Sequence, residues 1–353
     1  ELAHHFLAAV PAGSIEAAVR YARRAAAEAT RACAYDDAVR YLERAVRACE
    51  LRLASSDAPD PAQRCELQLQ LAEALYRAGE GAAMRAIFED AAGRARAIAA
   101  PRLFARAAIG VTSRWLPEDG AAVRLLEEAL SMLAADDLAL RARTKARLAK
   151  TLYLFADSRA RREQMCAEAQ AAATQSGAPH ALAEVLADSL EALFHSDSLP
   201  QQDRLAAALH EAATAAGDAS LLLLSGAWQI VNAMRSGRLC EADRRLLEFS
   251  RLAEDLRQPR FLHHAAAFDA ALLMARGRLQ ESERRMEEAL ALGLRIDEAS
   301  ARWLHWGQLS HLRREQGRLE ELLDSGLKLR LPPDTPAALF YERSYRWATP
   351  HVF

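Results

Sequence analysis

Apolar residues along this chain recur at spacings of three and four, with polar residues between them. This spacing places the apolar side chains on one face of an α-helix. One example is the stretch Leu67, Leu71, Ala72 and Leu75, which precedes the turn-forming residue Gly79. The pattern therefore predicts amphipathic helices joined by short turns.

The turn signals recur with a period of 40 residues. The tripeptide Gly-Arg-Leu occurs three times at this spacing, beginning at Gly237, Gly277 and Gly317. Prolines mark a second phase of the same period, as at Pro61 and Pro101. Two turn signals per period indicate two helices per unit.

The second helix of each unit carries a recurring pattern of a small residue, then a large one four positions on, then a small one three positions further. Two examples are Ala38, Leu42, Ala45 and Ser282, Met286, Ala289. Small residues let neighbouring helices approach closely, and the large residue fills the space between them. Tetratricopeptide repeats use the same arrangement with a period of about 34 residues.

We therefore predict an all-α fold, a tetratricopeptide-like right-handed superhelical solenoid of about eight helix pairs with a period near 40 residues. The units are expected to start near residues 14, 62, 101, 137, 178, 219, 258 and 295 of one repeat domain, 1–331. The remaining residues, 332–353, are expected to be a C-terminal tail, because prolines soon after Leu331 cannot continue a helix.

Composition narrows the class of protein. The 353 residues include 46 basic and 48 acidic side chains, for a net charge of −2. This balance lacks the basic excess of a nucleic-acid-binding domain, so no direct nucleic-acid contact is expected. Strand-forming residues are scarce, which argues against a sheet-based enzyme. No apolar run approaches the roughly 20 residues that cross a bilayer, so no membrane association is expected.

The cysteines indicate the compartment. The five cysteines are isolated from one another and form no Cys-x-x-Cys motif. This usage favours reduced thiols and a cytoplasmic location over disulfides or zinc. Cys166 and Cys240 lie in second-helix stripes and are expected to be packed in the core.

Several stretches resemble a known family. They are residues 1–6, 18–22, 34–38, 256–259, 277–279, 308–309 and 312–319. Together they resemble the helical-repeat region of bacterial signal-transduction ATPases of the STAND/AAA type, and are most similar to LuxR-type large ATP-binding transcriptional regulators. The resemblance implies that this segment follows a nucleotide-binding domain, and it does not separate these regulators from antibiotic-regulatory proteins or nucleotide cyclases with the same core.

The chain itself lacks the Gly-x4-Gly-Lys-Ser/Thr phosphate cradle, and none of its three lysines follows a glycine. We therefore expect no cofactor in this chain, with ATP and magnesium bound only by a neighbouring domain. Because the sequence starts at Glu1 without an initiating methionine, we expect a piece of a longer protein.

No catalytic or metal site is expected. The adjacent histidines at 4–5 and 263–264 would point about 100° apart on a helix, so neither pair can chelate one ion well. The cluster His195-Ser196-Asp197-Ser198 lies at an expected turn, where capping a helix is a simpler role than acyl transfer. We predict that the chain is not an enzyme.

The candidate binding surface lies on the first helices, which line the concave groove of a solenoid. Large side chains recur there, whereas stability alone would be served by alanine, and aromatic, methionine and arginine side chains suit adaptable recognition. The candidate groove residues are Arg143, Arg147, Lys150, Tyr153, Trp228, Met234, His264, Phe268, Met274, His311 and Arg314. The alternative is that some of them are partly buried in a tight superhelix. Truncating a groove residue is expected to change stability by about 0.5 kcal/mol or less.

Charge changes along this candidate groove. Arg143, Arg147 and Lys150 form a basic stripe in the fourth unit, where the second unit has the acidic and amide residues Glu66, Gln70 and Glu73. An anionic ligand or an acidic peptide could bind the basic stripe, and a solvated helix face explains the same residues. Trp306, early in a first helix, is instead expected to be a packed core residue.

The sequence thus favours a non-catalytic repeat domain that binds a protein partner or a small-molecule effector in its groove, as the sensor of an ATPase-type transcriptional regulator. The alternatives are a structural scaffold for protein assembly, including possible homo-oligomers, and the same module in a nucleotide cyclase.

Overall fold

The computed structural model describes residues 2–9, 14–53, 60–112, 120–155, 157–195, 198–318 and 320–321. All regular structure in these ranges is helical, with α-helices α1 to α16, one short 3₁₀ helix and no strand. The chain divides into two compact units, residues 1–113 and residues 114–353. The prediction of an all-α repeat solenoid is confirmed.

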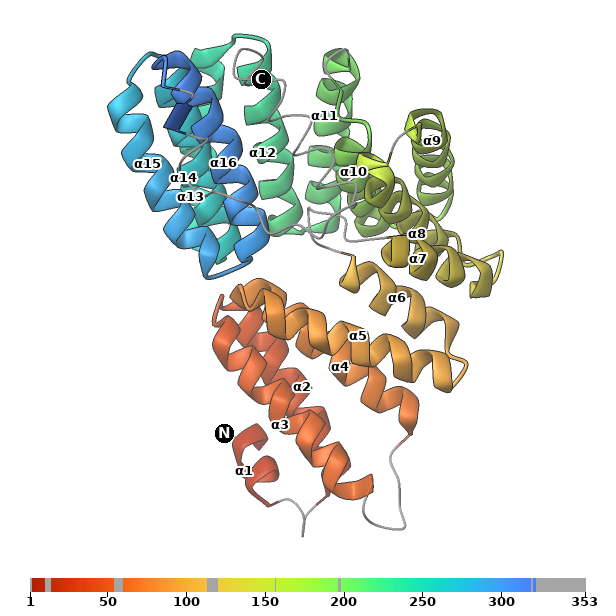
Figure 1. Cartoon of the computed structure of the whole chain (residues 1–353). Helices are drawn as coiled ribbons and strands as arrows, with labels where there is room; N and C mark the ends of the chain where they lie inside the picture. The colour runs from red at the N-terminus through yellow and green to blue at the C-terminus, as the bar shows by residue number, and fades with distance from the viewer. Residues whose placement is uncertain are drawn as a thin grey trace. The chain divides into compact units, whose positions relative to one another are not determined.

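The first unit contains α1 to α6 (Figure 1). The helices are α1 (Leu2–Ala8), α2 (Ile15–Arg31), α3 (Tyr35–Leu53), α4 (Pro61–Ala78), α5 (Gly81–Ala97) and α6 (Pro101–Val111). Each helix packs against the next one along the chain, and the first helices α4 and α6 also contact each other. The short α1 is held on α2, where the Phe6 ring stacks on the Tyr21 ring with 4.9 Å between centroids.

The second unit contains the remaining helices. They are α7 (Gly120–Met132), α8 (Leu138–Thr151), the 3₁₀ helix η1 (Leu152–Leu154), α9 (Arg159–Gln175), α10 (Pro179–Ala192), α11 (Leu199–Ala216), α12 (Ala219–Arg235), α13 (Leu239–Leu256), α14 (Pro259–Ala275), α15 (Leu279–Leu294) and α16 (Glu298–Glu315). Consecutive helices pack together, and the first helices α8, α10, α12 and α14 each contact the next in that series. This nearest-neighbour packing is typical of a helical repeat protein.

Prolines fix where first helices begin. Pro61, Pro101, Pro179 and Pro259 are the first residues of α4, α6, α10 and α14. Proline is favoured there because its missing N–H would have no intrahelical partner in any case, and its φ already suits the helix. The second phase of the sequence period therefore corresponds to helix starts.

Left-handed backbone closes most of the turns. Gly79, Gly177, Gly217, Gly237, Gly277 and Gly317 all have positive φ, between 64° and 86°. Cys33, Ala99, Asp157 and Arg257 adopt the same conformation without being glycine, with φ from 51° to 56°. A side chain makes this conformation unfavourable by about 1–2 kcal/mol, so these four turns hold local strain.

The repeated Gly-Arg-Leu turn has a fourth element that the sequence pattern did not reveal. A glutamate follows each arginine by three residues, and the two side chains pair at the start of the second helix. Arg238 Nε lies 2.9 Å from Glu241 Oε2, and Arg278 Nε donates to Glu281 Oε1 at 2.7 Å. Arg318 and Glu321 pair in the same way. The glutamate also sits in the first turn of the second helix, where negative charge is favourable.

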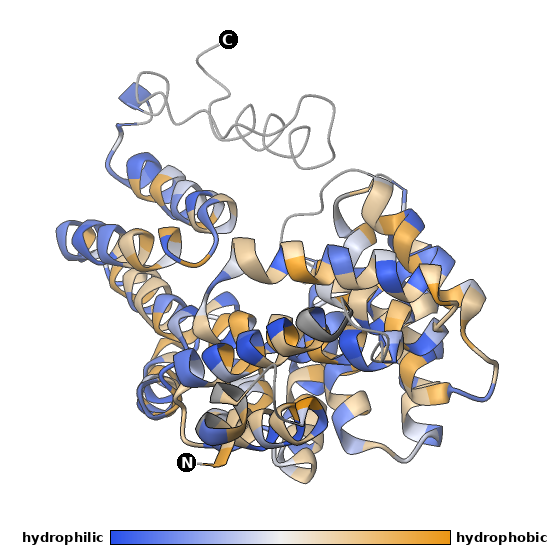
Figure 2. Cartoon of the chain, turned by 90° about the horizontal axis from the view of Figure 1, so that it is seen from below, coloured by the Kyte–Doolittle hydropathy of each residue, from blue (hydrophilic) through white to orange (hydrophobic). Residues whose placement is uncertain are grey.

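The second-helix pattern forms the core, as predicted. Leu42, Leu126 and Met286 are buried together with the small residues on either side of them, except that Ala122 is half-buried. Figure 2 shows the matching two-sided colouring of many helices, hydrophobic on one side and hydrophilic on the other. The expectation for cysteine was half right, since Cys166 is buried but Cys240 is exposed. The core prediction is wrong for Cys240 because this residue lies outside the buried face of α13, whose first buried residue is Ala242.

Two glycines allow helices to approach closely. A Cβ atom at Gly110 would lie 2.4 Å from the Phe88 ring, and one at Gly293 would lie 2.6 Å from the Ala301 Cβ. Both distances are far below the van der Waals contact of carbon atoms. These positions therefore require glycine for packing, although neither has a positive φ.

The predicted extent of the repeat domain, 1–331, stays a prediction. The predicted tail, 332–353, lies outside the described residues. Among the described helices, none combines the length and apolar character needed to cross a membrane.

Candidate functional site

The predicted basic stripe of α8 lies against an acidic stripe of α10. Arg143 Nη2 donates to Glu184 Oε1 at 2.9 Å. Arg147 Nε donates to Asp188 Oδ2 at 2.8 Å, and Lys150 Nζ lies 2.8 Å from Glu191 Oε2. The three cations and three carboxylates thus form a ladder between adjacent first helices, the α8–α10 ladder.

This ladder is partly removed from water. The side chains of Arg147 and Asp188 are only 14% and 8% exposed. Burial by itself would lower the pKa of Arg147, but the Asp188 carboxylate outweighs this effect and holds the pKa above its ordinary value. Lys150 Nζ lies 3.8 Å from Asp188 Oδ1 as well, so Asp188 faces two cations. Removing this carboxylate would deprive both cations of their most buried counter-charge.

The α8 stripe therefore does not present free positive charge to a ligand. Glu184, Asp188 and Glu191 each follow their basic partner by 41 residues, which is one repeat. Sequence reasoning missed the pairing because it considered each stripe alone. Comparing the same helix position in consecutive units would have revealed it.

Ion pairs also join neighbouring first helices in the first unit, but here the earlier helix carries the carboxylates and the later helix carries the cation. Arg106 of α6 pairs with Glu66 of α4 at 2.5 Å and with Glu73 at 3.4 Å. Arg23 of α2 donates to the side-chain oxygen of Gln70 at 3.1 Å. Polar stripes on first helices thus join consecutive repeats in both units.

Tyr153 and Trp228 belong to a cluster of aromatic and cationic groups contributed by α12 and by the residues that follow α8 and α10. Tyr153 lies in η1, just past α8, and its ring stacks on the His195 ring with 6.3 Å between centroids. Trp228 packs on Phe194 at 5.5 Å. Arg235 links the two pairs, because its guanidinium lies 4.5 Å from the Phe194 centroid and donates to the His195 carbonyl. Burial raises the pKa of the Tyr153 phenol.

The remaining candidate residues lie on α12, α14 and α16. Met234, Phe268 and Met274 are half-buried and pack against the edges of core clusters. His311 and Arg314 are exposed and in contact with each other, with 3.0 Å between Arg314 Nη2 and His311 Nδ1.

His264 has the most unusual environment of the candidates. Its ring lies between the rings of Phe261 and Phe268, with centroids 6.4 and 6.1 Å away. Burial, followed by repulsion from His263 and Arg260, lowers the pKa of His264 to about 3. The imidazole is therefore neutral at physiological pH and acts as an aromatic packing group.

Trp306 is 5% exposed, as the core interpretation predicts. Among the described residues, no group of three or more histidine, cysteine or acidic side chains could hold a metal ion. The hydroxyl of Ser198 accepts a hydrogen bond from the backbone N–H of His195 at 3.0 Å and donates one to its carbonyl at 2.8 Å. Ser198 therefore closes the turn before α11, in a structural role.

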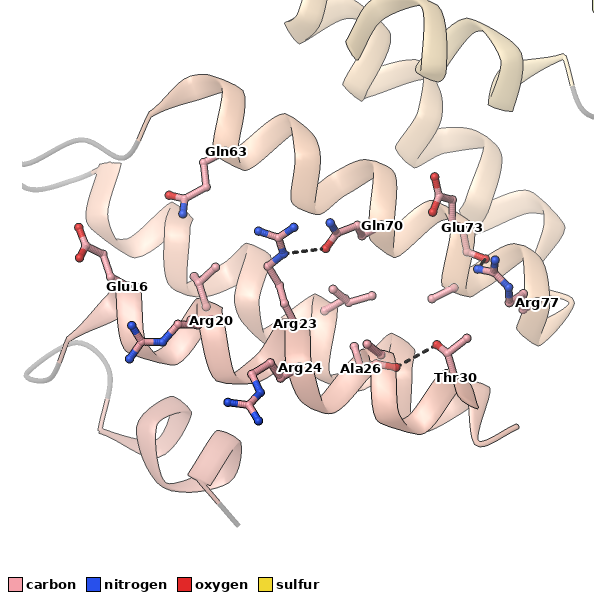
Figure 3. A pocket seen from close by; sticks show the side chains of 14 residues that line it. Glu16, Arg20, Arg23, Arg24, Ala26, Thr30, Gln63, Gln70, Glu73 and Arg77 are labelled. Carbon is pink, nitrogen blue, oxygen red and sulfur yellow. Dashed lines mark hydrogen bonds between the residues drawn. The ribbon is translucent and has the colours of Figure 1, made fainter. Parts of the chain in front are cut away.

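The first unit contains a hollow that the sequence did not predict. It has a volume of about 510 Å³ and lies between the first helices α2 and α4 (Figure 3). Val19, Ala26 and Ala74 contribute buried apolar surface to its lining, and Arg20, Arg23 and Arg24 contribute exposed charge. The missed signal is a cluster of three arginines within five positions of one first helix.

No protein-family model matches the chain, and no curated protein matches it. Among solved structures, the chain is similar to a protein described as a circular tandem repeat protein with novel repeat topology and enhanced subunit contact surfaces. The two are 16% identical, the alignment covers 98% of this chain and 96% of the other, and the TM-score is 0.16.

Proposed function

We propose that this chain is a non-catalytic protein-binding repeat domain and that its first helices form the recognition surface. The observation that supports this most directly is the recurrence of large, partly exposed side chains at intervals of 40 residues. Trp228 and Phe268 are one such pair, and Met234 and Met274 are another. Partly exposed aromatic and methionine side chains provide adaptable contact surface for a partner.

In its finer form, the proposal is that the domain is the sensor of a bacterial ATPase-type transcriptional regulator of the LuxR type. The resemblance of the repeat stretches to that family supports this assignment. A partner or effector on the first helices would shift the parent protein between closed ADP and open ATP states, provided that it binds the two states unequally. The ATP and magnesium would belong to the neighbouring domain.

A photo-crosslinking amino acid tests where the partner binds. It is placed at His311, which is exposed on the first helix α16, and, as the matched control, at Leu247, which is 54% exposed on the second helix α13. A discrete cross-linked protein from His311 but not from Leu247 is the expected result. Equal cross-linking from both positions, or none from His311, would contradict the proposed surface.

The assignment to an ATPase-type regulator is tested separately, from the coding sequence on both sides of this segment. The coding sequence upstream should encode a Gly-x4-Gly-Lys-Ser/Thr motif, and the downstream sequence should encode a helix-turn-helix. A cyclase domain in place of the DNA-binding domain would support the alternative. A coding region without any nucleotide-binding domain would leave a structural scaffold as the better assignment.

A further inference from the structure

The hollow between α2 and α4 differs in charge from the rest of the first-helix surface. Arg20, Arg23 and Arg24 are exposed, and none of them forms an ion pair within the part of the chain that the structure describes. Arg143 and Arg147 of α8, by contrast, are each paired with a carboxylate of α10. The positive charge of α2 is therefore available to a partner.

The guanidinium groups are spread along the helix. In Figure 3 Arg23 points across to Gln70 of α4, while Arg20 and Arg24 extend in other directions from α2. Three groups that do not converge cannot surround one small anion. They suit a partner that carries several negative groups along its length, and the planar guanidinium binds carboxylates in a bidentate manner.

The lining also contains apolar and acidic groups. Val19, Ala26 and Ala74 are at most 4% exposed and form the closed floor of the hollow, whereas Ala27 of the same lining is exposed. Glu16 and Glu73 belong to the same lining. A continuous phosphate backbone would be repelled at these two carboxylates, whereas a peptide can place an uncharged residue there.

We propose that this hollow binds an acidic peptide segment of a partner protein, with its carboxylates on Arg20, Arg23 and Arg24 and an apolar side chain against the exposed Ala27. A volume of about 510 Å³ is within the range of about 300–1,000 Å³ that is usual for ligand sites. The inference rests on the proposed function, because it assumes that first helices recognise partners. It adds a second binding surface, which lies in the first unit, and it specifies an acidic peptide as the partner there.

Fluorescence polarisation with the full chain tests this site. The probe is a dye-labelled peptide of alternating glutamate and leucine, compared with a lysine–leucine peptide and a single-stranded oligonucleotide. We expect the acidic peptide alone to bind, and its affinity to fall at high salt because exposed charges are screened. The double variant Arg20→Gln with Arg24→Gln should weaken binding by about tenfold or more, because charge-assisted hydrogen bonds are lost. Glutamine preserves helix propensity, so the fold should be retained.

Arg31→Gln is the matched control, because Arg31 is exposed on the same helix but does not line the hollow. The inference is overturned if the acidic peptide does not bind, if the oligonucleotide binds as well, or if Arg31→Gln weakens binding equally. If His311 cross-links no partner while the peptide binds as described, the proposed recognition surface fails and this site stands. If His311 cross-links a partner but the acidic peptide does not bind, the site between α2 and α4 is refuted and the proposed recognition surface stands.

Discussion

The close approach of α15 and α16 predicts that Gly293→Ala destabilises the second unit. The added Cβ would lie 2.6 Å from the Ala301 Cβ and 2.7 Å from the His263 Cε1 atom. Favourable carbon–carbon contacts need about 3.5–4.0 Å, so the helices would have to separate by about 1 Å. Overpacking of this kind costs about 1–3 kcal/mol. Gly293 is in the last turn of α15, where alanine restores little helix propensity.

Gly307→Ala is the matched control. Gly307 is in the middle of α16, and a Cβ there would have no neighbour within 4 Å. This substitution should stabilise by about 0.5–1 kcal/mol, because alanine favours the helix interior. The two variants should therefore change stability in opposite directions.

Amide hydrogen exchange of α14 to α16 is the suitable measurement, because the unfolding of repeat arrays departs from two-state behaviour. Gly293→Ala should speed exchange in these helices and should disturb the hydrogen bond of 2.7 Å between His263 Nδ1 and the Ala289 carbonyl. If Gly293→Ala slows exchange as much as Gly307→Ala does, the packing of α14, α15 and α16 is not as described.

Three further predictions concern charge, backbone and pH. Asp188→Ala should destabilise by about 3 kcal/mol, because Arg147 and Lys150 lose the most buried carboxylate that faces them; adding Arg147→Ala should recover part of this loss in a double-mutant cycle measured by amide hydrogen exchange of α8 and α10. Arg257→Gly should stabilise by about 0.5–1 kcal/mol, because Arg257 has a φ of 52° that glycine adopts without strain, and a loss of stability would contradict this. His264, with its pKa lowered to about 3, should reduce stability as the pH falls below about 6.5, since the unfolded chain binds the proton first. His264→Phe should flatten this pH dependence, measured as the amide protection of α14, and an unchanged dependence would refute the argument.

Much of the fold could be predicted from local signals. Proline at a helix start and glycine at a left-handed turn act through their own backbone, so Pro259 and Gly277 mark their positions without reference to distant residues. Apolar spacing likewise identifies a buried face such as that of Leu42 and Met286. These features depend on residues within one helical turn of each other.

The surface could not be predicted in the same way, because it depends on pairing between repeats. A basic stripe is a binding site or half of an ion-pair ladder, depending on what lies one repeat away. Arg147 was therefore expected to tolerate truncation, whereas its contact with Asp188 predicts a substantial cost. Conversely, the sequence shows the arginine cluster of α2, but only the structure distinguishes Arg20 and Arg24 from the α8 stripe, because no carboxylate among the described residues pairs with them.

The α8–α10 ladder has a consequence for rearranging the repeats. Leu224, Trp228 and Val231 of α12 occupy the positions that Glu184, Asp188 and Glu191 occupy in α10, 40 residues earlier. Deleting residues 179–218 would keep the 40-residue phase intact but bring α8 next to apolar and aromatic side chains. Arg143, Arg147 and Lys150 would then lose the carboxylates of α10 that they now face. Units with the same backbone are therefore not interchangeable modules, and the charge pattern encodes the order in which they must follow one another.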